Sequence, residues 1–443
     1  MRHYRNAEFL EPSDRQKEKV FARPVARLRK GGDQEEGQAQ AHMESAFTIP
    51  FLERIFQSKF SFATDIRLLW KGRESFEIVF DALRGAEQMI CLQFYIFRND
   101  ETGRQLADLL KGKSQAGVRV YLLYDHFGSF GTPRSFWNEM RVAGIRIRAS
   151  RPFKWTLPFH YVHRDHRKLI VIDSKRAFTG GLNVANEYSG FHLRMRRGGW
   201  RDTGIILEGP IVEELFNTFQ RSWFTWGGEK IEFNEMRKTP DTTTQAGDLP
   251  SKSPSAFPVR GGIPALPIFV YSVKGRRRMR GLLRYSINRA QASIFLTTAY
   301  FAPSLRMARA LENAVRRGVD VRLLVPGKSD IPAASYAGRA FFTRLLKAGV
   351  KIYTYMGEML HAKTYLFDQS WSIIGSTNLD YQSLMYNDEG NVGILDDGFA
   401  SHLSEIFEED LKNASKIEHE TWRRRPLSDK LKEHFFALFR KRL

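Results

Sequence analysis

Amphipathic segments of helix length alternate with short apolar runs along most of the chain. Apolar residues recur at helical spacing in three segments of the first half, at 75–88, 102–117 and 133–144. Each is followed by an apolar or β-branched run typical of a strand, at 89–97, 118–125 and 145–150. Each helix ends near a glycine that precedes the next strand, a common helix stop signal. The alternation predicts an α/β fold with a mainly parallel sheet flanked by helices.

The same pattern starts again in the second half. Three stretches, at 279–303, 306–330 and 340–355, match earlier ones at 76–100, 102–126 and 135–149 in the same order. A repeat of this length indicates a duplicated domain rather than a solenoid. The region between the copies is rich in Thr, Ser, Pro and Lys and has no apolar period, which is typical of a linker.

These shifts divide the chain into five predicted parts. They are a mobile polar tail (1–43), a first domain (44–233), a linker or long loop (234–262), a second domain (263–415) and a basic amphipathic C-terminal segment (416–443).

Composition narrows the class of partner. The 443 residues are 42% hydrophobic, so global disorder is excluded, and two domains are the expectation for this length. The 69 Lys and Arg residues against 49 Asp and Glu residues give a net charge of +20, which favours nucleic acid, acidic lipids or phosphorylated substrates. The single cysteine, Cys91, lies in an apolar run and fits a buried strand in a reducing, cytosol-facing protein. We expect neither a membrane-spanning segment nor a signal peptide.

One motif occurs in both halves after the third matched segment. The first copy reads His166-x-Lys168-x4-Asp173-x6-Gly180-Gly181-x-Asn183. The second reads His361-x-Lys363-x4-Asp368-x6-Gly375-Ser376-x-Asn378, with His361 lying 195 positions after His166. A pattern without a purpose would have drifted after duplication, so the motif indicates a functional site.

This paired motif resembles that of the phospholipase D superfamily, over about residues 60–413. Within it the chain is most similar to bacterial cardiolipin synthases, in stretches such as "HRDHRKLIVIDSKRAFTGGLNVANEY" and "LHAKTYLFDQSWSIIGSTNLDYQSL". The resemblance implies two tandem phospholipase D-like α/β domains, each with a mixed, mostly parallel sheet. It also implies that they pack about a pseudo-twofold axis with both half-sites in one cleft.

The motif residues suit phosphodiester chemistry. A neutral imidazole can attack an anionic phosphodiester and form a phosphoenzyme, while a second imidazole donates and accepts protons. Lys168, Lys363, Asn183 and Asn378 can hold the phosphoryl oxygens as charge builds. The resemblance assigns His166 as the nucleophile and His361 as the acid/base.

Each histidine needs an acceptor on its other ring nitrogen. Aligning "GGWRDTGIIL" with "MYNDEGNVGIL" places Asp202 opposite Glu389, and we predict these two as the orienting carboxylates. Glu187 competes for the first position because it lies nearer the motif. Asp173 and Asp368 belong to the motif and to the predicted catalytic set, although a role in fixing the strand-to-loop turn fits them better.

Other interpretations apply to the neighbouring residues. A metal site at His160, His163 and His166 is disfavoured because the second half repeats one histidine, and no metal or cofactor is expected. His160 and His163 are instead expected as head-group contacts or cleft-wall residues. Gly181 and Ser376 are expected near the phosphate, where the Ser376 hydroxyl could bind it.

The aromatic and basic loop 151–164 and two amphipathic segments, 47–62 and 428–443, either cover a core or contact a membrane surface.

The favoured function is a phosphatidyltransferase that joins two phosphatidylglycerol molecules into cardiolipin and glycerol. Its expected location is peripheral, at the cytoplasmic face of a bacterial inner membrane, on anionic phospholipid. Phospholipase D hydrolysis is a close variant, and a nuclease or other phosphodiesterase of the same superfamily is the alternative, so nucleic acid is the less favoured partner. A non-catalytic scaffold is disfavoured because both motifs are complete.

Overall fold

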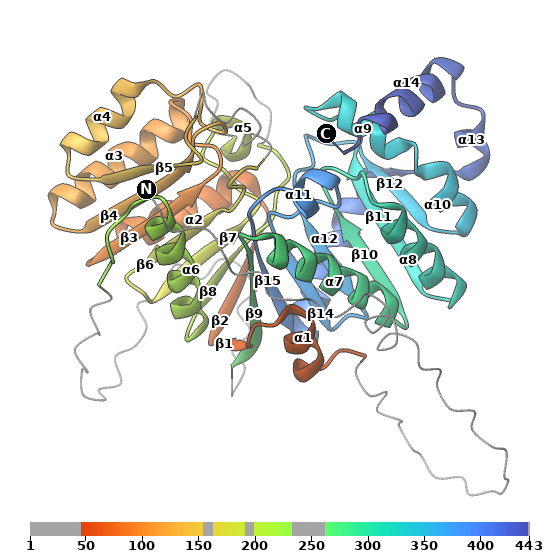
Figure 1. The fold of residues 1–443 in the computed structure, drawn as a ribbon, viewed down its shortest axis with the longest axis horizontal. Coiled ribbons are helices and arrows are strands. Elements are labelled where there is room, and N and C mark those ends of the chain that lie inside the picture. The colour runs from red at the N-terminus through yellow and green to blue at the C-terminus, as the bar shows by residue number, and fades with distance from the viewer. Residues whose placement is uncertain (1–45, 154–162, 191–198, 233–261, 442–443) are drawn as a thin grey trace, which may run out of the picture. The chain divides into compact units, whose positions relative to one another are not determined.

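The computed structural model describes residues 46–153, 163–190, 199–232 and 262–441. The predicted tail and nearly all of the predicted linker lie outside these residues. The described residues form one compact unit, and its two halves each contain a mixed sheet flanked by helices (Figure 1). No helix in the described parts is long and apolar enough to cross a membrane.

The first sheet has seven strands. Their spatial order is β2 (Asp65–Leu69), β8 (Gly204–Glu208), β7 (Arg176–Gly180), β6 (Leu169–Ile172), β3 (Met89–Phe94), β4 (Arg119–Asp125) and β5 (Arg146–Ser150). The helices of this half are α2 (Gly72–Arg84), α3 (Glu101–Gln115), α4 (Arg134–Val142), α5 (Asn186–Ser189) and α6 (Ile211–Thr225). The three helix–strand pairs predicted from periodicity are confirmed as α2–β3, α3–β4 and α4–β5.

The second sheet has nine strands. Their order is β1 (Ser61–Ala63), β9 (Ile263–Val270), β15 (Glu389–Leu395), β14 (Trp371–Gly375), β13 (Thr364–Phe367), β10 (Ser293–Thr297), β11 (Asp320–Pro326), β12 (Lys351–Tyr355) and β16 (Ala414–Lys416). Its helices are α1 (Ile49–Phe56), α7 (Val273–Arg289), α8 (Leu305–Arg316), α9 (Pro332–Arg339), α10 (Phe342–Ala348), α11 (Tyr381–Met385), α12 (Asp397–Lys412), α13 (His419–Arg423) and α14 (Leu427–Leu438). Residues 46–63 pack here rather than on the first sheet, because α1 contacts α7 and β1 pairs with β9.

The expectation that the sheets are mostly parallel is wrong. Among the described strands, only β3–β4–β5 and β10–β11–β12 pair in parallel, and the other pairs are antiparallel. Helical crossovers connect the parallel strands, whereas the three-residue turns 173–175 and 368–370 join β6 to β7 and β13 to β14. A connection this short permits only an antiparallel pair. Periodicity identified the crossover units and gave no information on these hairpins.

The two sheets share a core. One apolar cluster combines residues of the first sheet and α6 with residues of the second sheet and α12. Two further clusters lie on the outer faces, under α2, α3 and α4 in the first half and under α7, α8 and α10 in the second. Figure 1 shows α3 and α4 over β3–β5, and α7 and α8 over β10 and β11.

The motif aspartates each fix the start of a neighbouring strand. Asp173 accepts hydrogen bonds from the backbone N–H groups of residues 87, 88 and 89, at 2.7–2.8 Å. Asp368 accepts from the N–H groups of residues 291, 292 and 293, at 2.7–3.0 Å. Both residues have positive φ, 49° and 52°, which Asp and Asn tolerate better than other L-residues. Their carboxylates therefore join the β6–β7 and β13–β14 turns to β3 and β10.

Removing the Asp368 carboxylate should destabilise the second domain. Asp368→Ala leaves three N–H groups without this acceptor and places alanine in the left-handed region, so we expect the free energy of unfolding to fall by about 2–3 kcal/mol. Asp368→Asn retains one oxygen acceptor and the backbone preference, and should lose about half as much. Urea denaturation measures both variants. Equal losses for Ala and Asn would contradict the assigned contacts.

Candidate active site

The two motif histidines are held by the opposite half of the chain. The backbone N–H of His166 donates to the carbonyl of Asp388 at 2.9 Å, and the N–H of His361 donates to the carbonyl of Arg201 at 2.7 Å. Parallel bridges pair Asp165 with Asp388 and Arg201 with Leu360. These reciprocal contacts relate the halves by the expected pseudo-twofold symmetry and bring both histidines to one site.

Each imidazole also contacts a buried carboxylate of the other half. His166 Nδ1 lies 3.0 Å from Glu389 Oε2, and His361 Nδ1 lies 2.6 Å from Asp202 Oδ2. The structure thus brings the two proposed orienting carboxylates beside the histidines. With Nδ1 facing the carboxylate, the other ring nitrogen, Nε2, remains for chemistry. Glu187 instead pairs with Arg98 at 3.2 Å and contacts neither histidine in the described contacts.

Glu389 and Asp202 are held in place differently. The Ser376 hydroxyl donates to Glu389 Oε2, and Asn387 Nδ2 donates to Glu389 Oε1 at 3.3 Å. At the position equivalent to Ser376, a Cβ on Gly181 would lie 2.0 Å from Asp202 Oδ1. A side chain at position 181 would clash with Asp202, so glycine is required there. The Ser376 hydroxyl, which we expected to bind the phosphate, donates to Glu389 instead.

The lysines lie beside the histidines, and both side chains are buried. Lys168 Nζ donates to the His166 carbonyl at 2.7 Å, and Lys363 Nζ donates to the His361 carbonyl and lies 2.8 Å from His361 Nδ1. Burial lowers the pKa of Lys168 to about 7 and that of Lys363 to about 8. Burial and the nearby lysine also lower the pKa of His166, and bring that of His361 to about 3. Both shifts favour neutral imidazoles.

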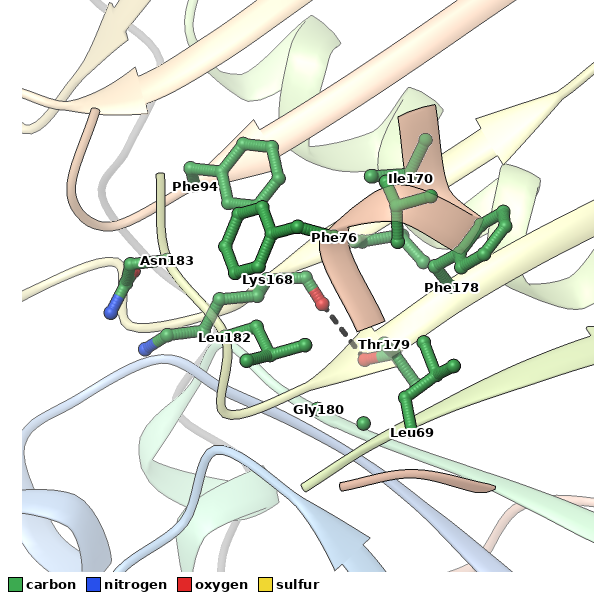
Figure 2. A pocket seen from close by; sticks show the side chains of 13 residues that line it. Leu69, Phe76, Phe94, Lys168, Ile170, Phe178, Thr179, Gly180, Leu182 and Asn183 are labelled. Carbon is green, nitrogen blue, oxygen red and sulfur yellow. Dashed lines mark hydrogen bonds between the residues drawn. The ribbon is translucent and has the colours of Figure 1, made fainter. Parts of the chain in front are cut away.

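An apolar cavity behind Lys168 contributes to this desolvation. It encloses about 40 Å³ and lies between α2 and strands β6 and β7 (Figure 2). Figure 2 shows Phe76, Phe94 and Phe178 around it, and the hydrogen bond of 2.8 Å from the Thr179 hydroxyl to the Lys168 carbonyl. The lysine therefore has an apolar environment on this side, which disfavours its charged form.

A larger cavity of about 870 Å³ opens in front of the histidines. Both halves line it, and it contains His166 and His361 together with aromatic and basic side chains. The aromatic residues at the histidines are Tyr95 beside His166, and Tyr188, Trp200 and Tyr300 beside His361, with ring centroids 5.0–6.4 Å apart. Sequence reasoning missed these four residues. Tyr188 and Trp200 follow the first motif closely, whereas Tyr95 and Tyr300 come from the ends of β3 and β10, which only the fold brings to the site.

The structure does not bring all predicted residues to this cavity. Asn378 lines it, but Asn183 faces the smaller cavity, accepting from the Ile96 N–H and donating to the Tyr188 hydroxyl. Asp173 and Asp368 lie away from the cavity. Each follows a strand that begins directly after the motif lysine, so about 15 Å of extended chain separates the two residues. Their carboxylates bind backbone rather than the reacting groups, which corrects their place in the catalytic set.

The histidine cluster of the sequence separates in the structure. His160 lies outside the described residues. His163 lines the cavity and its Nδ1 lies 2.8 Å from the Tyr386 carbonyl, while His166 faces Glu389. Over the described ranges, no group of three or more His, Cys, Asp or Glu side chains could hold a metal ion.

The lowered pKa of Lys168 should make stability depend on pH. Between its folded pKa of about 7 and the ordinary value of 10.5, the folded protein binds fewer protons at this lysine than the unfolded chain. The free energy of unfolding therefore rises with pH through that window, and Lys168→Met loses this rise. We expect the variant's stability advantage over wild type to shrink from about pH 7 to about pH 10 in urea denaturation. Lys432→Met, at an exposed lysine, controls for the loss of one charge, and a pH-independent difference for Lys168→Met would contradict the assignment.

Comparisons with known proteins agree with this arrangement. Residues 79–223 and 283–411 match the family model described as "Cardiolipin synthase, PLD-like domain". The probable cardiolipin synthase YwiE of Bacillus subtilis (strain 168) is 33% identical over 85% of this chain and 72% of its own length. A cardiolipin synthase of Geobacillus sp. (strain WCH70) is 34% identical over 86% of this chain and 72% of its own length.

A solved structure shares the fold. The phosphatidylserine synthase of Haemophilus influenzae Rd KW20 superposes with a TM-score of 0.68 at 13% identity, covering 89% of this chain and all of that one. Each half of this chain carries one match to the family model, and each match includes one copy of the motif. With about a third of its residues shared over most of its length, this chain belongs to the cardiolipin synthase family of proteins with phospholipase D-like domains.

Proposed function

We propose that the protein is a cardiolipin synthase, which transfers a phosphatidyl group from one phosphatidylglycerol to another. The observation that carries the proposal is the pair of imidazoles, His166 and His361, each bound through Nδ1 to a carboxylate and lining one cavity. Two such groups are what a double displacement at phosphorus requires. The curated relatives carry the name cardiolipin synthase, which supports phosphatidylglycerol as the substrate.

In the first step, His166 Nε2 attacks the phosphorus of one phosphatidylglycerol. A P–N bond forms and the bond from phosphorus to the head-group glycerol oxygen breaks. Protonated His361 gives its proton to that oxygen, and glycerol leaves. The phosphatidyl group is then covalently held on His166, whose developing positive charge Glu389 stabilises.

In the second step, a hydroxyl of a second phosphatidylglycerol attacks the same phosphorus. His361, now neutral, takes the hydroxyl proton as the new P–O bond forms and the P–N bond breaks. Cardiolipin leaves and both histidines return to their starting states. Water in place of the lipid hydroxyl gives phosphatidic acid, which is phospholipase D hydrolysis.

The electrostatics of the site support an anionic reacting group. Lys168 and Lys363 are buried, and burial lowers their pKa values. A phosphodiester held at the histidines, close to these lysines, would favour their charged forms, so substrate binding and lysine protonation would reinforce each other. It would also raise the pKa of His361, which burial and the nearby Lys363 lower to about 3, as its role as an acid demands. The proposed steps use no metal or cofactor.

We further propose a peripheral location on the cytoplasmic face of a bacterial inner membrane. The substrate is an anionic lipid, and the net charge of +20 favours such a surface. The buried free thiol of Cys91 is compatible with a reducing compartment.

Two variants separate the roles of the histidines. Both His166→Ala and His361→Ala should reduce cardiolipin formation from phosphatidylglycerol, in EDTA, by at least about 10³-fold. A phosphodiester with a p-nitrophenol leaving group needs little help from an acid. On it, His361→Ala should still release about one p-nitrophenol per active site in a burst, because the first step proceeds and the second stalls.

His166→Ala should show no burst on this substrate. The reverse result would exchange the two roles. Plasmid cleavage without lipid turnover by the wild-type protein would replace the proposed function with a nuclease, and a product of phosphatidic acid alone would favour a hydrolase.

Glu389 should affect catalysis through its contact with His166. Glu389→Gln keeps the shape but loses the charge that stabilises the imidazolium, so kcat should fall by about 10²–10⁴-fold with KM little changed. Ser376→Ala removes only one hydrogen bond to that carboxylate and should cost about 10-fold. Steady-state kinetics with phosphatidylglycerol compare the two, and equal losses would show that the carboxylate charge is not the important feature.

A further inference from the structure

The C-terminal helix α14 is packed with its apolar side outward. Among its described residues, only Glu433 is buried. Large apolar side chains lie along its exposed face, at Leu427 (74% exposed), Leu431 (71%), Phe435 (56%) and Leu438 (79%). We refer to these four residues as the docking row. A helix that simply covers a core has the opposite orientation, with its apolar face buried.

Ion pairs fix this orientation. Arg339 of α9 contacts Asp429 at 3.0 Å and Glu433 at 3.1 Å, and Arg425 contacts Glu433 at 2.6 Å. The ring of Phe436 also stacks on Tyr336 of α9, with centroids 5.9 Å apart. The polar face of α14 is therefore bound to α9, and turning the docking row inward would separate the buried Glu433 carboxylate from its arginine partners.

The first amphipathic segment behaves differently. In α1, Leu52 and Phe56 are buried in the outer core of the second half, where the helix packs on α7. Of the two ends that the sequence identified as amphipathic, α1 covers a core and α14 presents its apolar residues outward.

The helix that carries the docking row lies beside elements that line the active-site cavity. Figure 1 shows α14 beside α9, and Ile331 and Ala334 at the start of α9 line the cavity, as does Lys441 just after α14. Across the cavity, the loop after β4 carries Phe127 (52% exposed), which also lines the cavity, and Phe130 (79% exposed). Exposed apolar side chains thus occur near the cavity in both halves.

Charge identifies the partner. Lysines and an arginine accompany the docking row, at Lys430, Lys432, Arg440 and Lys441, in a chain of net charge +20. Apolar side chains flanked by basic ones are the pattern of a segment that lies in the interface of an anionic bilayer. We propose that the docking row, with Phe127 and Phe130, inserts into anionic lipid and places the cavity mouth over the head groups.

Vesicle binding tests the docking row directly. Full-length protein carrying His166→Ala, which prevents turnover, is sedimented with vesicles of phosphatidylcholine containing phosphatidylglycerol. Adding Leu431→Ser, Phe435→Ser and Leu438→Ser should weaken binding at least about 10-fold. The matched control places three serines at exposed apolar residues elsewhere, Val142, Phe224 and Val273, and should bind like the parent.

The possible results separate this inference from the proposed function, on which it rests only for the identity of the lipid. Vesicle binding is measured without catalysis. If α14 is needed for binding but the wild-type protein makes no cardiolipin, the proposed function is overturned and the docking surface is retained. Unchanged binding of the docking-row variant would overturn the docking surface. If the docking-row variant has a lower oligomeric state in light scattering and unchanged vesicle binding, the lipid docking surface is also overturned. The docking row would then form a contact between copies of the chain. Equal binding to pure phosphatidylcholine would overturn the anionic partner.

A second measurement does not depend on removing side chains. Cys91 is fully buried, so Leu431→Cys provides an accessible thiol for a polarity-sensitive fluorophore. Its emission should shift to the blue with phosphatidylglycerol vesicles, whereas the same label at Val142→Cys should not respond. An unchanged spectrum at Leu431→Cys would contradict insertion.

Discussion

The pairing of each histidine with a carboxylate of the opposite half is the interaction on which the site depends. His166 faces Glu389 and His361 faces Asp202, so neither half contains a complete histidine–carboxylate pair of its own. Backbone hydrogen bonds beside each pair and the apolar core shared by the two sheets hold the halves in register. Because the carboxylate determines which ring nitrogen carries the proton, a shift between the halves would change both geometry and protonation. The fold and the proposed chemistry are therefore coupled at the same contacts.

Pseudo-symmetry does not make the two half-sites equal. Glu389 is held by a hydroxyl and an amide, whereas the residue facing Asp202 is a glycine that leaves it room. Among the described residues, three aromatic rings lie beside His361 and one beside His166. Burial also lowers the pKa of His361 to about 3. Two imidazoles in different surroundings are suited to different steps, which a double displacement requires.

The ends of the described chain illustrate how packing decides the role of an amphipathic helix. The helices α1 and α14 are both amphipathic, with apolar residues recurring at helical spacing among charged ones. The ion pairs of the buried Glu433 with Arg339 and Arg425 hold the polar face of α14 against the protein. Its apolar face is left for a non-aqueous partner beside the cavity, and the proposed substrate is a lipid.

The amino-acid sequence predicts the duplication, the helix–strand units around β3–β5 and β10–β12, and the motif residues, because these depend on local periodicity and on spacing along the chain. It also identified Asp202 and Glu389 as the orienting pair, through their equivalent positions in the two copies. Tertiary contacts set which carboxylate faces which histidine, and they direct Ser376 to Glu389 and Asp173 and Asp368 to strand starts. They also pair most of the described strands antiparallel and hold α14 with its apolar face outward. These features depend on contacts between residues far apart in sequence, and local patterns carry no information about such contacts.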